Sequence, residues 1–258
     1  MKKTEQSIQG YLECDSTIVR ITSLEDIKDF LIRYGKSTSE KSEGELELLT
    51  EQKPDRGNLV RDDCDIAYSQ NPKVLQWGVP IMSYKVEEST IAIADNAFAL
   101  NSYSNSSHYC LTSILLPESI VAIGHSAFVS TRNLTRINLS SALILIGNMA
   151  FYDCNKLKDV VLPETTKYLG TRSFGRTGIT TITIPYKVEK IGSFAFANCS
   201  QLKTVVFEGV PKDIGSEVFG GDTALEKITI PQGTIDYFIK ALFPLPKDLF
   251  VEKNPSLG

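Results

Sequence analysis

Residues 179–196 read ITTITIPYKVEKIGSFAF, and this pattern returns along the chain at a nearly constant interval. The interval is clearest at six phenylalanines: Phe98, Phe128, Phe151, Phe174, Phe196 and Phe219. After a first step of 30 residues, the steps between them are 23, 23, 22 and 23 residues. A fixed period in the low twenties indicates one structural unit copied along the chain. The period therefore decides the fold before any single motif is considered.

Each unit carries a short alternating segment, a turn, an Ile-Gly pair and a closing Ala-Phe pair in its best copies. In Ile182-Thr183-Ile184, neighbouring side chains point to opposite faces, so the isoleucines face inward and the threonine faces outward. Pro185 ends this strand because it has no N–H for the ladder. A glycine recurs at one turn position, where a positive φ or a close backbone approach is expected: Gly124, Gly147, Gly170, Gly192 and Gly215.

Stacking of these units places each inward Leu, Ile and Phe next to its counterpart in the neighbouring unit, about 4.8 Å along the axis. Each buried Phe or Leu then contributes on the order of 1.5–3 kcal/mol of apolar burial. One unit alone cannot bury its apolar face, so only the stack is stable. We expect the column of phenylalanines to form the spine of the fold.

The unit resembles the BspA-like (Treponema-type) leucine-rich repeat, which reads L-x-x-[VI]-x-[IL]-P and then I-x-x-I-G-x-x-A-F-x-x-C. The resemblance covers residues 81–230, and Cys154 and Cys199 occupy the Cys position, three residues after the Phe. Thr131, Thr177 and Asp222 hold that position in other copies. The resemblance implies a curved, mostly β solenoid that serves as an interaction surface and is often displayed on bacterial cells. It implies no catalytic residues.

We therefore predict a mainly β fold, α/β by content, built as a curved leucine-rich-repeat solenoid of about six to seven units. Residues 1–80 are predicted to form a small α/β cap, with a helix near 24–34 and a linker near 37–45. Residues 81–233 form the repeats. Residues 234–258 contribute a C-terminal capping helix and tail.

Several local patterns support the two caps. Residues 17–21 alternate as a short strand, and residues 46–49 and 74–77 are apolar patches expected to pack on the first unit. After Ile230-Pro231 the repeat pattern stops, and residues 235–243 read as an amphipathic helix that ends before Pro244. We expect its apolar face to cover the final unit rather than to bind a partner.

Composition excludes several classes of function. The net charge is −4, and residues 81–258 carry no basic stripe, which argues against nucleic acid as a ligand. No run of eighteen apolar residues exists, so we expect no transmembrane segment. The first residues, MKKTEQ, are not followed by the apolar region of a signal peptide. This favours the cytoplasm by default, and the cell surface or secretion if a leader has been removed.

Residues with catalytic or ligating chemistry are few. The five cysteines, Cys14, Cys64, Cys110, Cys154 and Cys199, form an odd count without metal-like spacing, so we expect small buried residues with free thiols. His125 is expected to be a solvated turn residue. The run Asp62-Asp63-Cys64-Asp65 lacks the Gly and the distant Glu of an EF-hand loop. We therefore expect no metal, no cofactor and no enzymatic activity.

The outward face of the strands is the first candidate for binding. Its polar and β-branched character follows from the repeat phase, and it lacks aromatic residues, which disfavours carbohydrate. The candidate residues are Ser113, Leu115, Arg136, Asn138, Asp159, Val161, Thr181, Thr183, Thr204, Val206, Lys227 and Thr229. The second candidate is the polar insert at 101–109, which breaks the period and contains Tyr103, Asn105, His108 and Tyr109.

These observations predict a non-enzymatic protein–protein interaction or adhesion protein, a monomer whose protein ligand is unidentified. A competing hypothesis gives residues 1–80 a regulatory or enzymatic role and makes the solenoid their scaffold. A third treats the solenoid as a spacer without a specific ligand.

Overall fold

The structure, a computed structural model, describes residues 82–99 and 111–253 in full, together with Asp63 and the backbone of five N-terminal strands. These strands are β1 (Ser7–Cys14), β2 (Thr17–Ser23), β3 (Leu59–Arg61), β4 (Ala67–Gln70) and β5 (Lys73–Trp77). The strand predicted at 17–21 is confirmed by β2. The predicted helix at 24–34, the linker at 37–45, the patch at 46–49 and the insert at 101–109 lie outside the described residues.

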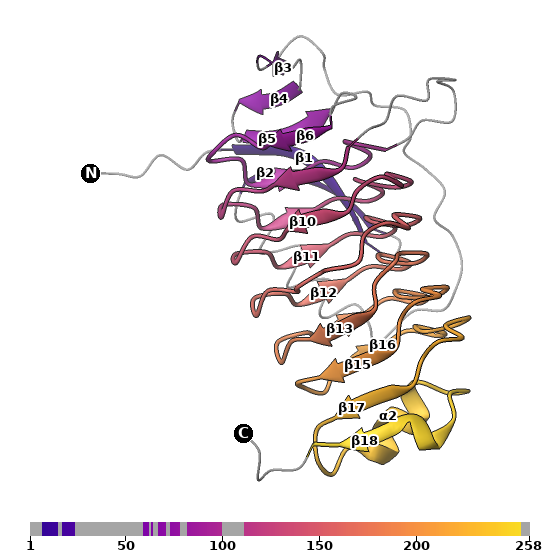
Figure 1. Cartoon of the computed structure of the whole chain (residues 1–258). Coiled ribbons are helices and arrows are strands. Elements are labelled where there is room, and N and C mark those ends of the chain that lie inside the picture. Colours follow the sequence, from indigo (N-terminus) through magenta and orange to yellow (C-terminus); the bar gives the residue numbers. More distant parts are fainter. Residues whose placement is uncertain are drawn as a thin grey trace.

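All units but one contribute a longer strand to the parallel strands that run along one side of the solenoid, which form two sheets (Figure 1). Its first sheet contains β6 (Ser83–Lys85), β8 (Ser113–Leu115) and β10 (Arg136–Asn138). Its second sheet contains β13 (Thr181–Ile184), β15 (Thr204–Phe207), β17 (Lys227–Ile230) and β18 (Phe250–Glu252). The burial pattern of β13 alternates as the sequence predicts, with Ile182 and Ile184 buried and Thr181 and Thr183 exposed. We call the outward side of this ladder the strand face.

A second ladder is built from two-residue strands that end at the Ile of the Ile-Gly pair, with Leu169 in place of Ile in one unit and Ala94 in place of Gly in the first. Its members are β7 (Ala92–Ile93), β9 (Ala122–Ile123), β11 (Leu145–Ile146), β12 (Tyr168–Leu169), β14 (Lys190–Ile191) and β16 (Asp213–Ile214). Strand β5 pairs in parallel with β7, and β4 and β3 continue the same sheet in antiparallel order. The N-terminal strands therefore extend the solenoid beyond its first unit.

The third side of each unit, which we call the turn side, carries the spine phenylalanine. Consecutive rings stack at centroid distances of 5.1, 5.2, 5.2, 5.4 and 5.7 Å, with interplanar angles between 3° and 17°. Such offset stacks add favourable aromatic contact to the burial of each ring. The first step of 30 residues leaves the stack intact, since Phe98 and Phe128 lie at 5.1 Å. The predicted spine is confirmed.

Backbone geometry on the turn side refines the expectation for the recurring glycines. The residues two before and two after the spine Phe adopt positive φ, for example Met149 (55°) and Asp153 (63°) around Phe151. The glycine of the Ile-Gly pair is required instead by close approach. A Cβ on Gly192 would lie 2.4 Å from the backbone nitrogen of Thr171 in the preceding unit. The sequence predicted either a positive φ or a close backbone approach at these glycines, and the structure shows the close approach.

The longer-strand ladder is interrupted at one unit. Residues 157–162 form only an isolated bridge, Arg136 with Asp159. No backbone hydrogen bond joins residues 157–162 to residues 179–184, although both segments lie in the fully described range. This break follows the 22-residue step, in which Gly178 closes the turn so tightly that a Cβ would lie 2.5 Å from the Asn155 carbonyl oxygen. The shortened turn keeps the spine intact but separates the two longer-strand sheets.

The C-terminal residues close the solenoid with a helix and one additional strand. Helix α2 (Ile235–Ala241) buries Phe238 fully against Phe207, with ring centroids 4.7 Å apart. Leu242 is also buried, whereas Ile235 is exposed, so only part of the predicted apolar face covers the core. The chain then returns as β18, which pairs in parallel with β17. The sequence analysis did not anticipate this strand.

Replacement of Phe151 by Ala is expected to lower the free energy of unfolding by about 3–5 kcal/mol, because a fully buried ring is removed from between two stacked neighbours. The matched outward substitution Thr183→Ala is expected to change it by less than about 0.5 kcal/mol. Urea unfolding followed by circular dichroism measures both. Equal losses would contradict the assignment of inward and outward positions.

Truncation after Ile230 removes α2 and β18, and with them the cover over Phe207 and the pairing partner of β17. An uncovered strand edge invites pairing between molecules. We expect the truncated protein to form dimers or larger aggregates in size-exclusion chromatography with light scattering. A monomer with an unchanged melting temperature would show that these elements are not a cap.

Candidate functional site

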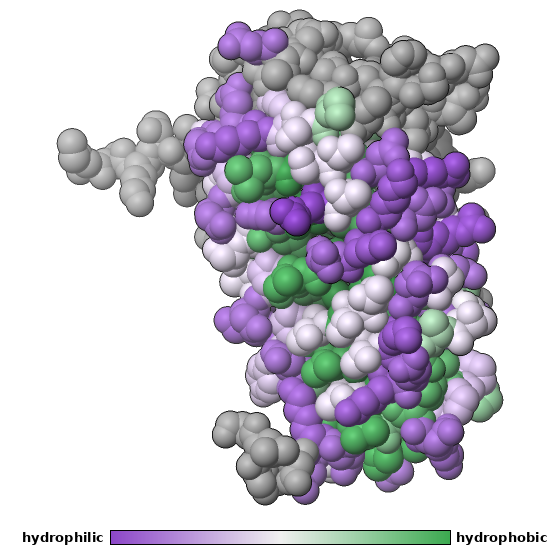
Figure 2. Space-filling model, in the orientation of Figure 1, coloured by the Kyte–Doolittle hydropathy of each residue, from purple (hydrophilic) through white to green (hydrophobic). Residues whose placement is uncertain are grey.

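The structure gathers the twelve predicted strand-face residues on one exposed surface. Most are well exposed, and Ser113, Thr204, Val206 and Thr229 are half-buried. Parallel pairing aligns them in rows, as where Thr183 lies beside Val206. Figure 2 shows this side of the molecule, where apolar patches lie among polar side chains. The four residues of the predicted binding loop, Tyr103, Asn105, His108 and Tyr109, lie outside the described residues.

The apolar part of the strand face is more prominent than the sequence suggested. Val161 has an exposed fraction of 82%, the largest of any large hydrophobic side chain among the described residues, and Leu115 reaches 46%. Val161 lies in the unit where the ladder is interrupted.

Beyond the ends of β13 and β15, Tyr186 (72%) and Val210 (42%) are also exposed. The sequence analysis missed both residues. The sequence does contain a signal for Tyr186. The residue after the strand-ending Pro is Glu118 or Glu164 in two other units, so this position faces solvent, and a Tyr there is an exposed aromatic side chain.

Charges on the strand face are mixed and engage each other across units. Lys203 Nζ lies 3.0 Å from Glu226 Oε1, and both side chains are well exposed. Pairs of this kind contribute little stability because solvent screens them. They leave a surface without a dominant sign of charge. The face therefore offers shape and scattered apolar contacts rather than a charged docking site.

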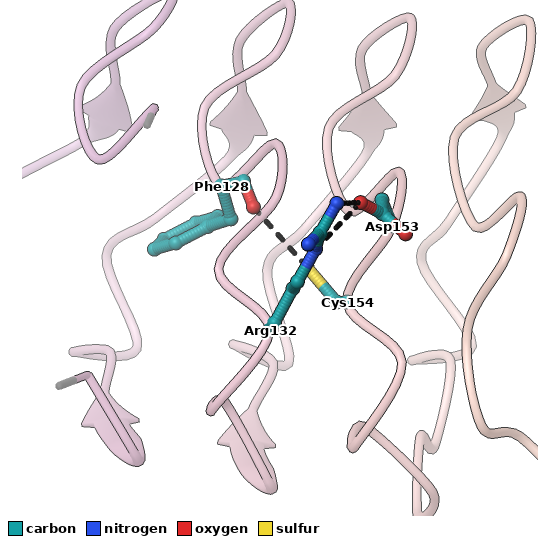
Figure 3. Close-up of polar contacts among 4 residues, drawn as sticks. All are labelled: Phe128, Arg132, Asp153 and Cys154. Carbon is teal, nitrogen blue, oxygen red and sulfur yellow. Dashed lines mark hydrogen bonds and ion pairs between the residues drawn. The ribbon is translucent and has the colours of Figure 1, made fainter. Parts of the chain in front are cut away.

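The turn side has its own polar contacts between units (Figure 3). The Cys154 thiol donates to the Phe128 carbonyl oxygen at 3.1 Å, and Thr131 Oγ1 donates to the same oxygen at 2.7 Å. Arg132 donates from Nε and Nη2 to Asp153 Oδ2 at 2.8 and 2.6 Å. The Cys position of the repeat therefore supplies a buried donor to the preceding unit.

Burial raises the pKa of the Cys154 and Cys199 thiols to about 12. Thiolate is the reactive form of cysteine, so neither side chain can act as a nucleophile near neutral pH. Both thiols are free, as predicted for these two residues. The side chains of Cys14, Cys64 and Cys110 lie outside the described residues.

The residue types of a catalytic triad meet near His125. Its Nε2 lies 3.0 Å from Ser126 Oγ, and its backbone N–H donates to Asp95 Oδ1 at 2.6 Å. His125 lies in a turn, as predicted, and its side chain is half-buried rather than fully solvated. Ser126 is only 5% exposed, which denies a substrate access to its hydroxyl. The cluster therefore ties the first units together and has no room for chemistry.

Among the described residues, no group of three or more His, Cys, Asp or Glu side chains could hold a metal ion. Over the same residues, no helix has the length and apolar content needed to cross a membrane.

Asp222 is a half-buried acid at the Cys position of the last complete unit. Its Oδ1 accepts the Cys199 backbone N–H at 2.6 Å, whereas its buried Oδ2 has no hydrogen-bond partner among the described residues. Desolvation raises the pKa of Asp222 to about 8 from its ordinary value of 3.8, although the Cys199 hydrogen bond opposes this shift. The folded state therefore favours the protonated carboxyl.

The raised pKa gives Asp222 a defined effect on stability. Below pH 3.8 the carboxyl is protonated in both states, and from there to about pH 8 only the folded state keeps the proton. Stability must therefore fall as pH rises through this window. The variant Asp222→Asn keeps the acceptor without the charge, so its urea midpoint is expected to exceed that of the wild type increasingly from pH 4 to pH 8. Glu164→Gln, at an exposed acid, is the control, and a pH-independent difference for Asp222→Asn would contradict the assignment.

Comparison of the sequence with protein families gives a match to the BspA type leucine rich repeat region, in 6 copies over residues 78–191 and 121–245. No curated protein shows significant sequence similarity to the chain.

Solved structures share the fold at low sequence identity. The pneumococcal vaccine antigen PcpA matches with a TM-score of 0.64 and 21% identity, over 76% of this chain and 48% of its own. A Bacteroides ovatus leucine-rich repeat protein matches with a TM-score of 0.53 and 23% identity, over 74% and 48%. The T. pallidum leucine-rich repeat protein matches with a TM-score of 0.54 and 19% identity, over 75% and 97%. This chain thus spans about half the length of the first two proteins.

The family match covers well over half of the chain, and the same units form the stacked solenoid with its phenylalanine spine. The chain belongs to the BspA-type leucine-rich repeat family.

Proposed function

We propose that the chain is a non-enzymatic protein-binding solenoid that engages its ligand through the strand face. The observation that carries this proposal is the strongly exposed Val161 on the strand face, with Leu115 exposed on the same face and Tyr186 and Val210 exposed beyond the ends of β13 and β15. Scattered exposed apolar residues are normal, but apolar side chains on a rigid, regularly spaced face are suited to bind a partner. The mixed charges of the face suit a protein ligand better than a polyanion.

The size of the face limits how the ligand can bind. Eight strand positions at about 4.8 Å per step span roughly 35 Å, and a width of about three residues gives roughly 350 Å². A standard interface buries about 800 Å² on each partner. A stable ligand must therefore extend beyond the ladder. The exposed Tyr186 and Val210, which follow the carboxyl ends of two strands, are where we expect it to do so.

The absence of catalysis is part of the same proposal. The buried thiols and the inaccessible Ser126 hydroxyl lack the reactivity or access that a nucleophile needs. The alternative, in which residues 1–80 carry the activity, is less well supported, since β5 pairs with β7 and belongs to the solenoid's own ladder. The proposal fits display in adhesion on a cell surface and equally an intracellular partner, because the face is the same in either compartment.

Site-directed photo-crosslinking tests the face. A benzoylphenylalanine at Thr183 on the strand face is expected to give a discrete protein adduct from extract, whereas one at the exposed Lys240 of helix α2, outside both the strand face and the turn side, gives none. Unlabelled wild-type chain should suppress the adduct by competition. A competitor with Val161→Glu and Thr183→Glu, both at exposed positions, should fail to do so.

Adducts of equal strength from Thr183 and Lys240, or suppression by the double variant as efficient as by the wild type, would exclude the strand face as the binding surface. Circular dichroism of each variant checks that the fold is retained.

A further inference from the structure

A hollow of about 250 Å³ opens on the turn side, away from the strand face. Its lining comes from three consecutive units and combines glycine, alanine, two aromatic rings and two arginines: Tyr152, Arg172, Gly175, Arg176, Phe194, Ala197 and Asn198. None of these residues belongs to the strand face or to the titratable clusters described above.

The hollow lies where the position directly after the spine Phe carries small residues, in a column that also has Ala99 in the first unit and Gly220 in the last. The position directly after the spine Phe carries Val129 and Tyr152 in two earlier units, and then Gly175 and Ala197. The Tyr152 ring packs over the empty position, since a Cβ on Gly175 would lie 3.0 Å from Tyr152 Cδ2. Gly175 and Ala197 line the hollow, and the Tyr152 ring covers Gly175.

Two arginines line the hollow, and they stand on either side of Phe174 in the sequence. Arg172 precedes it by two residues and Arg176 follows it by two, and both are exposed and have positive φ. The Arg172 guanidinium lies over the Phe194 ring at 5.0 Å, and that of Arg176 lies 6.0 Å from the Tyr152 ring centroid. Stacking orders a planar guanidinium while its N–H groups remain able to donate at the edge.

Neither guanidinium has an acidic partner among the described residues. Arg132 provides the contrast, because its Nε and Nη2 both donate to Asp153 Oδ2. Arg172 and Arg176 have ring contacts but form no ion pair with any described carboxylate. The hollow therefore holds two ordered positive charges that lack a counter-charge.

We propose that this hollow binds an acidic segment of a protein partner, with its carboxylates on the guanidiniums of Arg172 and Arg176 and an adjacent apolar or aromatic side chain on Ala197, beside the Tyr152 ring. Arginine matches a carboxylate through paired N–H donors. Aromatic and arginine side chains around small residues are also the composition of interface anchor points. Two unpaired cations are too few for nucleic acid, which requires a longer row of phosphate contacts. This site shares no residue with the strand face, so the two binding proposals can be tested independently.

Nuclear magnetic resonance of the arginine side chains in the full chain tests the site directly. On titration with the peptide acetyl-Glu-Tyr-Glu-amide, the Nε–Hε signals of Arg172 and Arg176 are expected to shift. The Arg132 signal should not shift, because Asp153 already accepts from its Nε. The peptide acetyl-Gln-Tyr-Gln-amide, without carboxylates, and sodium acetate, without the tyrosine, are expected to give much smaller shifts.

Variants then assign the affinity to the two side chains. The double variant Arg172→Gln with Arg176→Gln is expected to weaken binding of the acidic peptide by about tenfold or more. Arg172→Lys keeps the charge and is expected to recover only part of the affinity, because lysine lacks the planar group. The exposed Arg136→Gln on the strand face is the matched control and should leave binding unchanged.

Three outcomes would overturn the proposal: equal shifts with the Glu and Gln peptides, equal shifts at Arg132, or unchanged affinity in the double variant. Shifts with acetate as large as those with the acidic peptide would also overturn the proposal, because they would show that the arginines bind any small anion. Because each variant lies at an exposed side chain, the fold should be retained, and circular dichroism checks this. None of these outcomes depends on the strand-face crosslinking experiment.

Discussion

Everything in this solenoid depends on one spacing, the rise from each unit to the next. The spine rings stack at 5.1 to 5.7 Å, which is close to the separation of hydrogen-bonded strands. The backbone of the turn side has the same spacing, because hydrogen bonds join each unit to the next. Phe128 N–H donates to the Ala150 carbonyl oxygen at 2.8 Å, and Phe151 N–H donates to the Ser173 carbonyl oxygen at 2.8 Å. Side-chain stacking and backbone pairing therefore reinforce each other. Any change that alters the rise must break both.

This shared spacing also explains why non-glycine residues accept a left-handed backbone. Such conformations are unfavourable for side chains as large as Met149, Arg172 and Phe194, each with φ between 54° and 60°. The backbone adopts positive φ two residues before and two residues after the spine Phe. This geometry points every second backbone N–H toward the next unit, where a carbonyl oxygen accepts it. The hydrogen bonds of the whole stack therefore hold these residues in place. The conformation belongs to the repeat and does not mark a catalytic residue.

The sequence predicts most of the fold because the core repeats, and little of the function because the surface does not. Phe151 must be buried wherever its pattern occurs, so its role follows from the period alone. β18 could not be predicted, since Phe250 to Glu252 carry no repeat signature and pair only because β17 leaves an edge open. The exposed Tyr186 and the Arg172–Arg176 pair occupy variable positions, where the repeat imposes no residue type. His125 lies in the predicted turn, but its contact with the buried Ser126 hydroxyl could not be predicted, because both residues stand at variable positions of the repeat.

The two candidate surfaces lie in the same part of the solenoid, and a common cause connects them. Between Phe151 and Phe196 the period shortens by one residue and the longer-strand ladder separates next to Val161. In the same units the column after the spine Phe changes from Tyr152 to Gly175, which opens the hollow. Regular units are structurally interchangeable, and a surface made only of them could not distinguish one partner from another. Specific recognition therefore has to come from departures from the repeat, and in the described part of this chain the exposed Val161 and the arginine-flanked hollow both lie where the unit is irregular.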